Sequence, residues 1–175
     1  ARRIFLALAA GGLLAATPAA LAQQAGKRYR VGLVLVGGPY SAMIDGLRDG
    51  LKEPGFEDGR EHILHIRDVK GDPGALESAA RALEQEEVAL IYSLSTSVTL
   101  AVKRATARVP IVFYAGTDPV AVGLVTSFAR PGGRLTGLHS LTTEVDAKRV
   151  EILKEISPKL RRVAVFYDPD NRSAQ

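Results

Sequence analysis

The sequence contains no cysteine, no tryptophan and three histidines in 175 residues. Without cysteine the chain forms no disulfide, offers no thiol nucleophile and cannot be a lipoprotein anchored through a modified cysteine. Two of the histidines form the pattern His62-x-x-His65. Residues three apart on a strand point to opposite faces, so this pair cannot share a metal ion. We therefore expect no metal centre.

The motifs of common enzyme classes are missing as well. There is no G-x-S-x-G elbow, no Walker loop and no G-x-G-x-x-G after the first predicted strand. The turn Gly37-Gly38-Pro39, which does follow that strand, is too short and too rigid to hold a pyrophosphate. These absences disfavour a small enzyme of flavodoxin-like shape, and we expect neither catalysis nor a bound cofactor.

The excess of basic residues is small. The formal net charge is +4, and two of the positive charges, Arg2 and Arg3, lie at the N-terminus. The remaining charges are spread along the chain, without a basic run interleaved with aromatic residues. This distribution argues against nucleic acid as a partner.

Residues 1–22 have the layout of a secretory signal peptide. Arg2 and Arg3 precede an apolar run over residues 4–16, and a segment of small residues ends at Ala22. The run is shorter than the ~20 residues that span a bilayer, which favours cleavage after Ala22 over an uncleaved anchor. The paired arginines fit the twin-arginine route as well as ordinary Sec export. We expect a periplasmic protein.

Short apolar runs alternate with amphipathic segments along the rest of the chain. Strands are predicted over residues 29–36, 62–69, 88–93, 110–114 and 163–167, with a brief extended piece at 135–138. Helices are predicted over residues 41–52, from Asp72-Pro73, after Ser95-Thr96-Ser97, from Pro119 to about Phe128, and after Thr143. Repeated β-α units predict an α/β fold with a doubly wound parallel sheet.

The last predicted helix begins with a capping-box pair, Thr143 and Asp146. Its apolar residues Val150, Leu153 and Ile156 are spaced to share one face. We expect that face to be the inner one.

The stretch from Pro110 to Gly137 contains the first candidate site. Its apolar start suits a strand that is buried on both faces. Asp118 then fits the N-cap of a helix, and Pro119 fits its first position. A helix N-terminus at the carboxyl end of a parallel strand offers N–H groups and partial positive charge to a ligand.

Three polar turns follow predicted parallel strands, and the fold would place them along one edge. They are Gly38–Ser41, Ser95–Ser97 and Gly116–Asp118. The candidate ligand-binding residues are Tyr40, Ser41, Ser95, Thr96, Ser97, Thr117 and Asp118. A ligand carboxylate would take N–H bonds from Ser97 or the next residue, and Asp118 or a hydroxyl would take an ammonium group. The alternative for each polar residue is that it only caps a helix.

Three tyrosines lie near the same edge. Tyr40, Tyr92 and Tyr114 follow or end predicted strands. Their rings would stack on a ring of a ligand, or else form part of the core.

Longer segments resemble a known family. The run DPVAVGLVTSFARPGGRLTG, followed by KRVEILKEISPKLRRVAVFYDPDN, is similar to the substrate-binding proteins of ABC importers, whose members include proposed tryptophan and tyrosine binders. GLRDGLKEPGFEDGR resembles the family's first helix and turn, and STSVTLAVKRAT resembles its third helix. Two positions depart from the family pattern: Arg134 replaces the usual asparagine, and Ser97 replaces a common proline.

The resemblance implies a type I periplasmic binding fold, in which two lobes close on a small molecule. Residues 27–137 would form the N-terminal lobe, and residues 138–175 would begin a C-terminal lobe that the sequence cuts short. The implied function is a receptor that delivers a small molecule, such as an amino acid, to an ABC permease, with the full-length protein a monomer. The alternative is an extracytoplasmic sensory or regulatory domain of the same fold.

Overall fold

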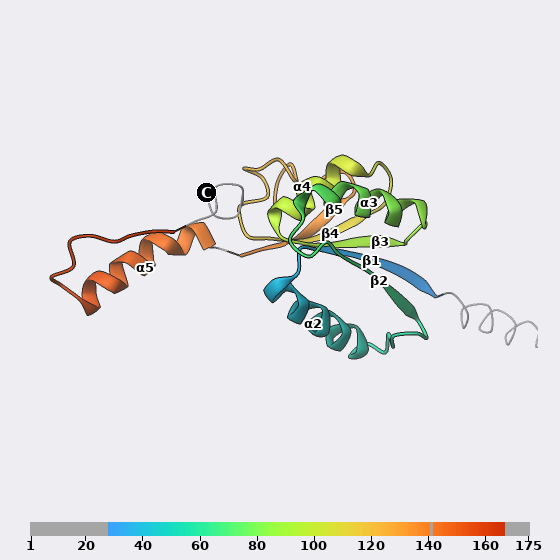
Figure 1. The fold of residues 1–175 in the computed structure, drawn as a ribbon, viewed down its shortest axis with the longest axis horizontal. Helices are drawn as coiled ribbons and strands as arrows, with labels where there is room; N and C mark the ends of the chain where they lie inside the picture. Colours follow the sequence, from blue (N-terminus) through green and yellow to red (C-terminus); the bar gives the residue numbers. More distant parts are fainter. Residues whose placement is uncertain (1–27, 141, 167–175) are drawn as a thin grey trace, which may run out of the picture.

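The computed structural model describes residues 28–140 and 142–166, so the predicted signal peptide lies outside the described residues. Five strands form one parallel sheet in the order β2-β1-β3-β4-β5 (Figure 1). They are β1 (Tyr29–Leu35), β2 (His62–Asp68), β3 (Leu90–Leu94), β4 (Ile111–Ala115) and β5 (Leu135–His139). The predicted α/β fold with a parallel sheet is thus confirmed.

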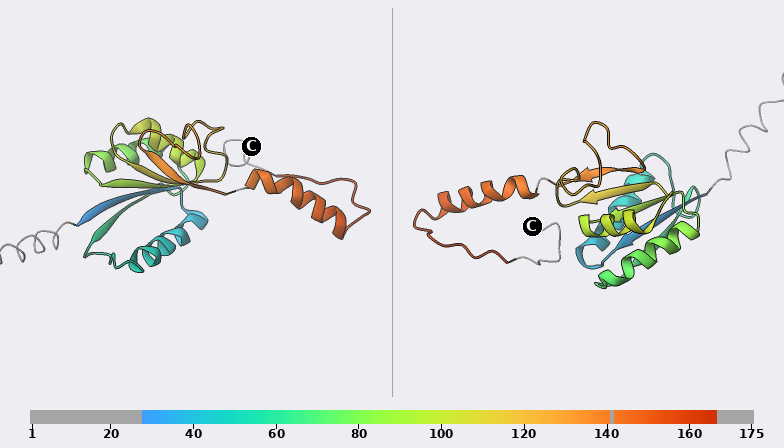
Figure 2. Two further views of the ribbon diagram at one scale, coloured as in Figure 1. Left: turned by 180° about the vertical axis from the view of Figure 1, so that it is seen from behind. Right: turned by 90° about the horizontal axis from the view of Figure 1, so that it is seen from above.

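Helices cover both faces of the sheet. In chain order the helices are α2 (Ser41–Lys52), α3 (Leu76–Gln85), α4 (Thr96–Ala105) and α5 (Thr142–Ile156). Figures 1 and 2 show α2 on one face of the sheet, α3 and α4 on the other, and α5 beyond the end of β5. Single 3-10 turns, η1 (Gly38–Tyr40) and η2 (Pro73–Ala75), lead into α2 and α3. None of the described helices is long and apolar enough to cross a membrane.

The continuous apolar runs in the strands fill a core on each side of the sheet. In β1, Leu33 and Leu35 pack in the cluster on the α2 side, whereas Val34 packs in the cluster of α3 and α4. All three side chains are at most 1% exposed. A strand without polar alternation can be buried in this way only when helices cover both faces.

His62 and His65 lie on opposite faces of β2, as their spacing predicts. His65 Nδ1 is 2.8 Å from Glu86 Oε2 on the α3 side, whereas His62 lies beside Leu51 of α2. His62 is buried, and neither of its ring nitrogens has a hydrogen-bond partner. Within residues 28–140 and 142–166, no three acidic or histidine side chains gather closely enough to hold a metal ion.

A carboxylate of α3 holds the connection between α4 and β4. Glu84 accepts hydrogen bonds from the backbone N–H groups of Ala107, Arg108 and Val109, over 2.7 to 3.2 Å. Burial raises the pKa of the Glu84 carboxyl, but these three donors and the Arg108 charge outweigh burial and hold the pKa below its ordinary value. The ionised carboxylate is therefore part of the folded structure.

Arg134 donates hydrogen bonds to carbonyl oxygens of the same α4–β4 connection. Its guanidinium donates to the carbonyl oxygens of Val109 at 2.8 Å, Lys103 at 2.9 Å and Thr106 at 2.6 Å. Two of these carbonyls end α4, where a cation also opposes the negative end of the helix dipole. The residue that departs from the family pattern thus has a structural task in this chain.

The predicted helix from Pro119 to Phe128 is wrong, because residues 116–133 form turns. A single turn begins at Asp118 and ends at Gly123, whose φ of 71° is left-handed. Lys103 Nζ then bonds the carbonyl oxygens of Gly123 and Leu124, which a continuing helix would need. Leu124 is 2% exposed, and burying it against α4 favours the turn over the helix.

The predicted strand over residues 163–167 is also wrong in its described part. Residues 163–166 form no strand, and Phe166 is 95% exposed. Tyr167 lies outside the described residues. A strand needs a neighbour to take its backbone hydrogen bonds, and no described strand pairs with this segment.

The last predicted helix is confirmed as α5, but the face that was predicted to be buried is exposed. Val150, Leu153 and Ile156 are 51%, 41% and 76% exposed. Figures 1 and 2 show the helix pointing away from the sheet, so these side chains meet no described core. The side chain of Thr143 lies outside the described part, and the capping box stays a prediction.

Gly137 provides a test of the β4–β5 packing. It lies opposite Phe113, and a Cβ there would come within 2.2 Å of the Phe113 carbonyl oxygen. We expect Gly137→Ala to lower the free energy of unfolding by about 1–3 kcal/mol through this overlap, measured by urea denaturation. Gly50→Ala is the control, because its Cβ would enter open space on α2 and should stabilise by about 0.8–1 kcal/mol. Equal effects of the two changes would contradict this register.

Glu84 makes the stability depend on pH. Its folded-state pKa lies below the unfolded value of about 4.3, so its contribution is full above that pH and is lost as the pH falls through the folded value. We expect Glu84→Gln to reduce stability at pH 7 and to flatten its fall below pH ~5, in urea titrations at each pH. Glu53→Gln controls for charge, because that exposed carboxylate makes no hydrogen bond within the described residues. An unchanged slope in Glu84→Gln would contradict the assignment.

Candidate functional site

The three predicted polar turns lie at one edge of the sheet. Strands β1, β3 and β4 are neighbours and run parallel, so Gly38–Ser41, Ser95–Ser97 and Gly116–Asp118 all follow strand ends on the same side. We call these three turns the carboxyl rim. In open α/β sheets, this edge is the usual place for a ligand.

Two buried threonines tie the second and third turns together. Thr96 Oγ1 lies 3.1 Å from Thr117 Oγ1 and accepts the N–H of Gly116 at 3.0 Å. Thr96 is fully buried and Thr117 is 7% exposed. Their hydroxyl groups therefore link two turns of the rim to each other, which is a structural role but not the helix capping considered as the alternative.

Ser95 begins α4 in a strained conformation. Its φ of 100° and ψ of 158° lie in a region that is almost exclusive to glycine. Gly37, at the end of β1, adopts the related values 79° and −157°. Two strand ends thus turn in the same way, and the strain at a non-glycine residue is a feature that clusters at functional sites. Sequence patterns do not reveal it, because Ser95 also fits an ordinary N-cap.

The N-terminus of α4 has fewer free donors than the sequence predicts. Ser95 Oγ accepts the N–H of Val98 at 3.3 Å, so the residue after Ser97 cannot give this bond to a ligand. The N–H groups of Thr96 and Ser97, in the first turn, have no acceptor within the helix. These two remain as donors at the rim.

The side chain of Ser97 does not face the rim. It lines a groove with Pro73 and Glu77, between the start of α3 and α4. Its Oγ is buried and has no hydrogen-bond partner. Because α4 turns this side chain toward α3, only the backbone N–H of Ser97 is placed to serve the ligand turn, and its predicted bond to a carboxylate stays a prediction.

Asp118 caps a turn with one of its two oxygens. Oδ1 accepts the N–H groups of Val120 at 2.7 Å and Ala121 at 3.2 Å. The residue is partly buried, and Oδ2 makes no hydrogen bond within the described residues. Because no helix follows, the third turn offers a carboxylate oxygen rather than the helix N-terminus that the sequence predicts.

The tyrosines line the α2 side of the rim. Tyr40, Tyr92 and Tyr114 are partly buried and pack against the core cluster around Leu94. Burial raises the pKa of the Tyr92 hydroxyl, and the neighbouring Tyr114 adds to the effect. Ser41, beside Tyr40, donates from Oγ to the Gly38 carbonyl at 2.9 Å. The rings are thus partly packed in the core, and stacking of a ligand on them stays a prediction.

The end of β5 adds a contact that the sequence patterns did not indicate. His139 stacks on Phe128, with ring centroids 5.2 Å apart. The next residue, Ser140, donates from its N–H to the Ala115 carbonyl at 2.9 Å. The chain thus leaves the sheet directly beside the third turn of the rim.

The sequence is similar to that of known proteins. Residues 31–175 match the family model described as ABC transporter substrate binding protein. A tyrosine-binding protein of Clostridioides difficile (strain R20291) is 32% identical over 123 residues, which are 70% of this chain and 35% of that protein.

Solved structures agree in fold. A conserved domain protein from Vibrio cholerae O1 biovar El Tor matches with a TM-score of 0.78 and 32% identity, over 85% of this chain and 50% of that one. The ABC domain from Streptococcus pneumoniae in complex with L-Trp matches with a TM-score of 0.59 and 25% identity, over 65% and 39%. The chain spans half or less of the length of each of these proteins. With the match over residues 31–175, the chain belongs to the ABC transporter substrate-binding protein family, which is not a family of enzymes.

Proposed function

We propose that the full-length protein is a periplasmic receptor that captures an aromatic amino acid between two lobes and delivers it to an ABC permease. Residues 27–137 form the first lobe in this proposal, and residues 138–175 begin the second. The signal peptide layout of residues 1–22 supports export. A relative named as a tyrosine-binding protein and a similar structure that holds L-Trp support the class of ligand.

The observation that carries the proposal is a set of polar groups at the carboxyl rim that are not used in hydrogen bonds within the rim itself. The N–H groups of Thr96 and Ser97 suit a carboxylate, because the N-terminus of α4 also carries partial positive charge. Asp118 Oδ2 suits an ammonium group at the neighbouring turn. An amino acid carries both charges, and the tyrosine rings on the α2 side provide a surface for its side chain.

The magnitudes explain why two lobes are needed. A helix terminus contributes about 0.3–2 kcal/mol toward an anion. Micromolar affinity requires about 8 kcal/mol. The rim therefore orients the ligand, and the second lobe provides the remaining contacts when it closes and excludes water. The full-length protein would act as a monomer.

Substitutions of Asp118 test the proposal, because they can remove its negative charge with or without removing its role as the acceptor that caps the turn. Asp118→Asn keeps an N-cap acceptor but removes the charge, whereas Asp118→Ala removes both. In calorimetry on the full-length protein, we expect both changes to weaken binding of L-tyrosine or L-tryptophan about tenfold or more, since the charge-assisted bond is lost. Only Asp118→Ala should also lower the melting temperature.

Ser97→Ala is the matched control at the neighbouring turn. Its side chain faces α3, so the affinity should stay unchanged. Unaltered affinity in Asp118→Asn, or no binding of either amino acid by the unmodified protein, would contradict the proposal.

A further inference from the structure

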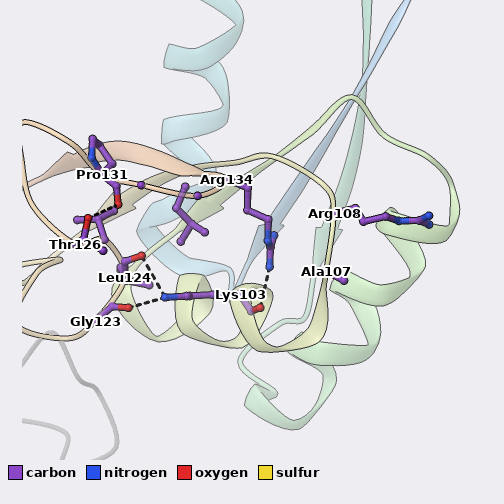
Figure 3. A pocket seen from close by; sticks show the side chains of 12 residues that line it. Lys103, Ala107, Arg108, Gly123, Leu124, Thr126, Pro131 and Arg134 are labelled. Atoms are coloured by element: carbon purple, nitrogen blue, oxygen red, sulfur yellow. Dashed lines mark hydrogen bonds between the residues drawn. The ribbon is translucent and has the colours of Figure 1, made fainter.

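A hollow of about 750 Å³ lies away from the carboxyl rim, between the end of α4 and the segment 123–135 (Figure 3). The rim is at the opposite end of α4, whose ten residues span about 15 Å. The volume is within the range of small-molecule sites. Its floor includes Leu124, Val125 and Leu135, three side chains that are buried.

Two cations border this hollow, and both retain unused donors. Lys103 Nζ bonds the carbonyl oxygens of Gly123 at 2.6 Å and Leu124 at 3.3 Å, which uses two of its three N–H groups. Arg134 makes three bonds to carbonyl oxygens and has five N–H groups. Two donors are left on Arg134 and one on Lys103.

No acid neutralises these charges within the described residues. The lining contains neither Asp nor Glu, and neither Lys103 nor Arg134 forms an ion pair there. Glu84 lies nearby, but its carboxylate is bonded to the backbone N–H groups of residues 107–109 and does not line the hollow. Arg108 contributes to the lining, but Figure 3 shows its guanidinium pointing away. The two cations are offset only by carbonyl dipoles.

We infer that this hollow is a second binding site, for a small monocarboxylate with an apolar body. The positive charges of Lys103 and Arg134 at the border of the hollow suit a carboxylate group, because hydrogen bonds to an ionised acceptor are stronger than those to carbonyls. The apolar floor favours a ligand with an apolar body, because burying apolar surface against Leu124, Val125 and Leu135 is favourable.

The test compares two probes of equal shape and different charge on the full-length protein. We expect 2-naphthoate to bind saturably, and at least about tenfold more tightly than the neutral 2-naphthalenemethanol, in calorimetry. Lys103→Met should remove most of this preference. Arg104→Met is the matched control, because Arg104 is the next residue but pairs with Glu77 outside the hollow.

A steric variant covers the case in which Lys103→Met disturbs the segment 123–135. Ala107 lines the hollow with an exposed methyl group, so Ala107→Trp should block naphthoate while the fold is kept. Asp118→Asn, which alters the rim, should still bind the probe with the affinity of the unmodified protein. Equal affinity for the two probes, unchanged binding in Ala107→Trp, or loss of binding in Asp118→Asn would overturn the inference. These outcomes are independent of whether the rim binds an amino acid.

Discussion

The parallel pairing of β1, β3 and β4 is the constraint on which the rest of the structure depends. Parallel neighbours must be joined by connections that return to the starting edge, so all strands end on the same side. Helices on both faces make these returns, and the strands between them must be apolar throughout. Leu33, Val34 and Leu35 meet this condition in three successive residues. The same constraint gathers three polar turns at one edge, which is the usual place for a ligand in open α/β sheets.

The candidate site shows how structural and ligand-facing roles divide among neighbouring polar groups. Thr96 and Thr117 use their hydroxyls on each other, and Ser95 uses its hydroxyl on Val98. Asp118 uses one oxygen on its own turn and keeps the other. A rim whose shape is fixed by internal hydrogen bonds is preorganised, so a ligand does not have to order it on binding.

Helix α4 joins the two regions in which we propose binding. Its N-terminus forms part of the carboxyl rim. At its other end, Arg134 donates hydrogen bonds to the last carbonyl oxygens of the helix, and Glu84 accepts hydrogen bonds from the N–H groups of the residues that follow. The Glu84 carboxylate thus accepts hydrogen bonds from the N–H groups of the α4–β4 connection, and the Arg134 guanidinium donates to its carbonyl oxygens. This arrangement gives hydrogen-bond partners to carbonyl and N–H groups that have none within a helix or strand.

Local signals in the sequence determined most of the sheet and of the helices that cover it. The apolar runs predicted the strands, with β3 displaced by one or two residues, and the apolar stripe of residues 41–52 predicted α2 with the bounds observed. Asp72-Pro73 predicted the start of a helix, which begins as the 3-10 turn η2. These signals suffice because cap residues and periodicity act within one or two turns of chain.

Only the tertiary structure decided the features that depend on distant partners. Asp118-Pro119 carries a helix signal as strong as Asp72-Pro73, but Lys103 takes the carbonyls at Gly123 and Leu124, and burial of Leu124 ends the turn. The direction of the Ser97 side chain follows from the rotation of α4 against α3. The sequence pattern predicts an inner face on α5 and a strand over residues 163–167. Neither packs in a core within the described residues, because a helix face or a strand is buried only where another element covers it. The sequence by itself determined which segments are able to form elements, and packing between segments far apart in the chain decided which of them do.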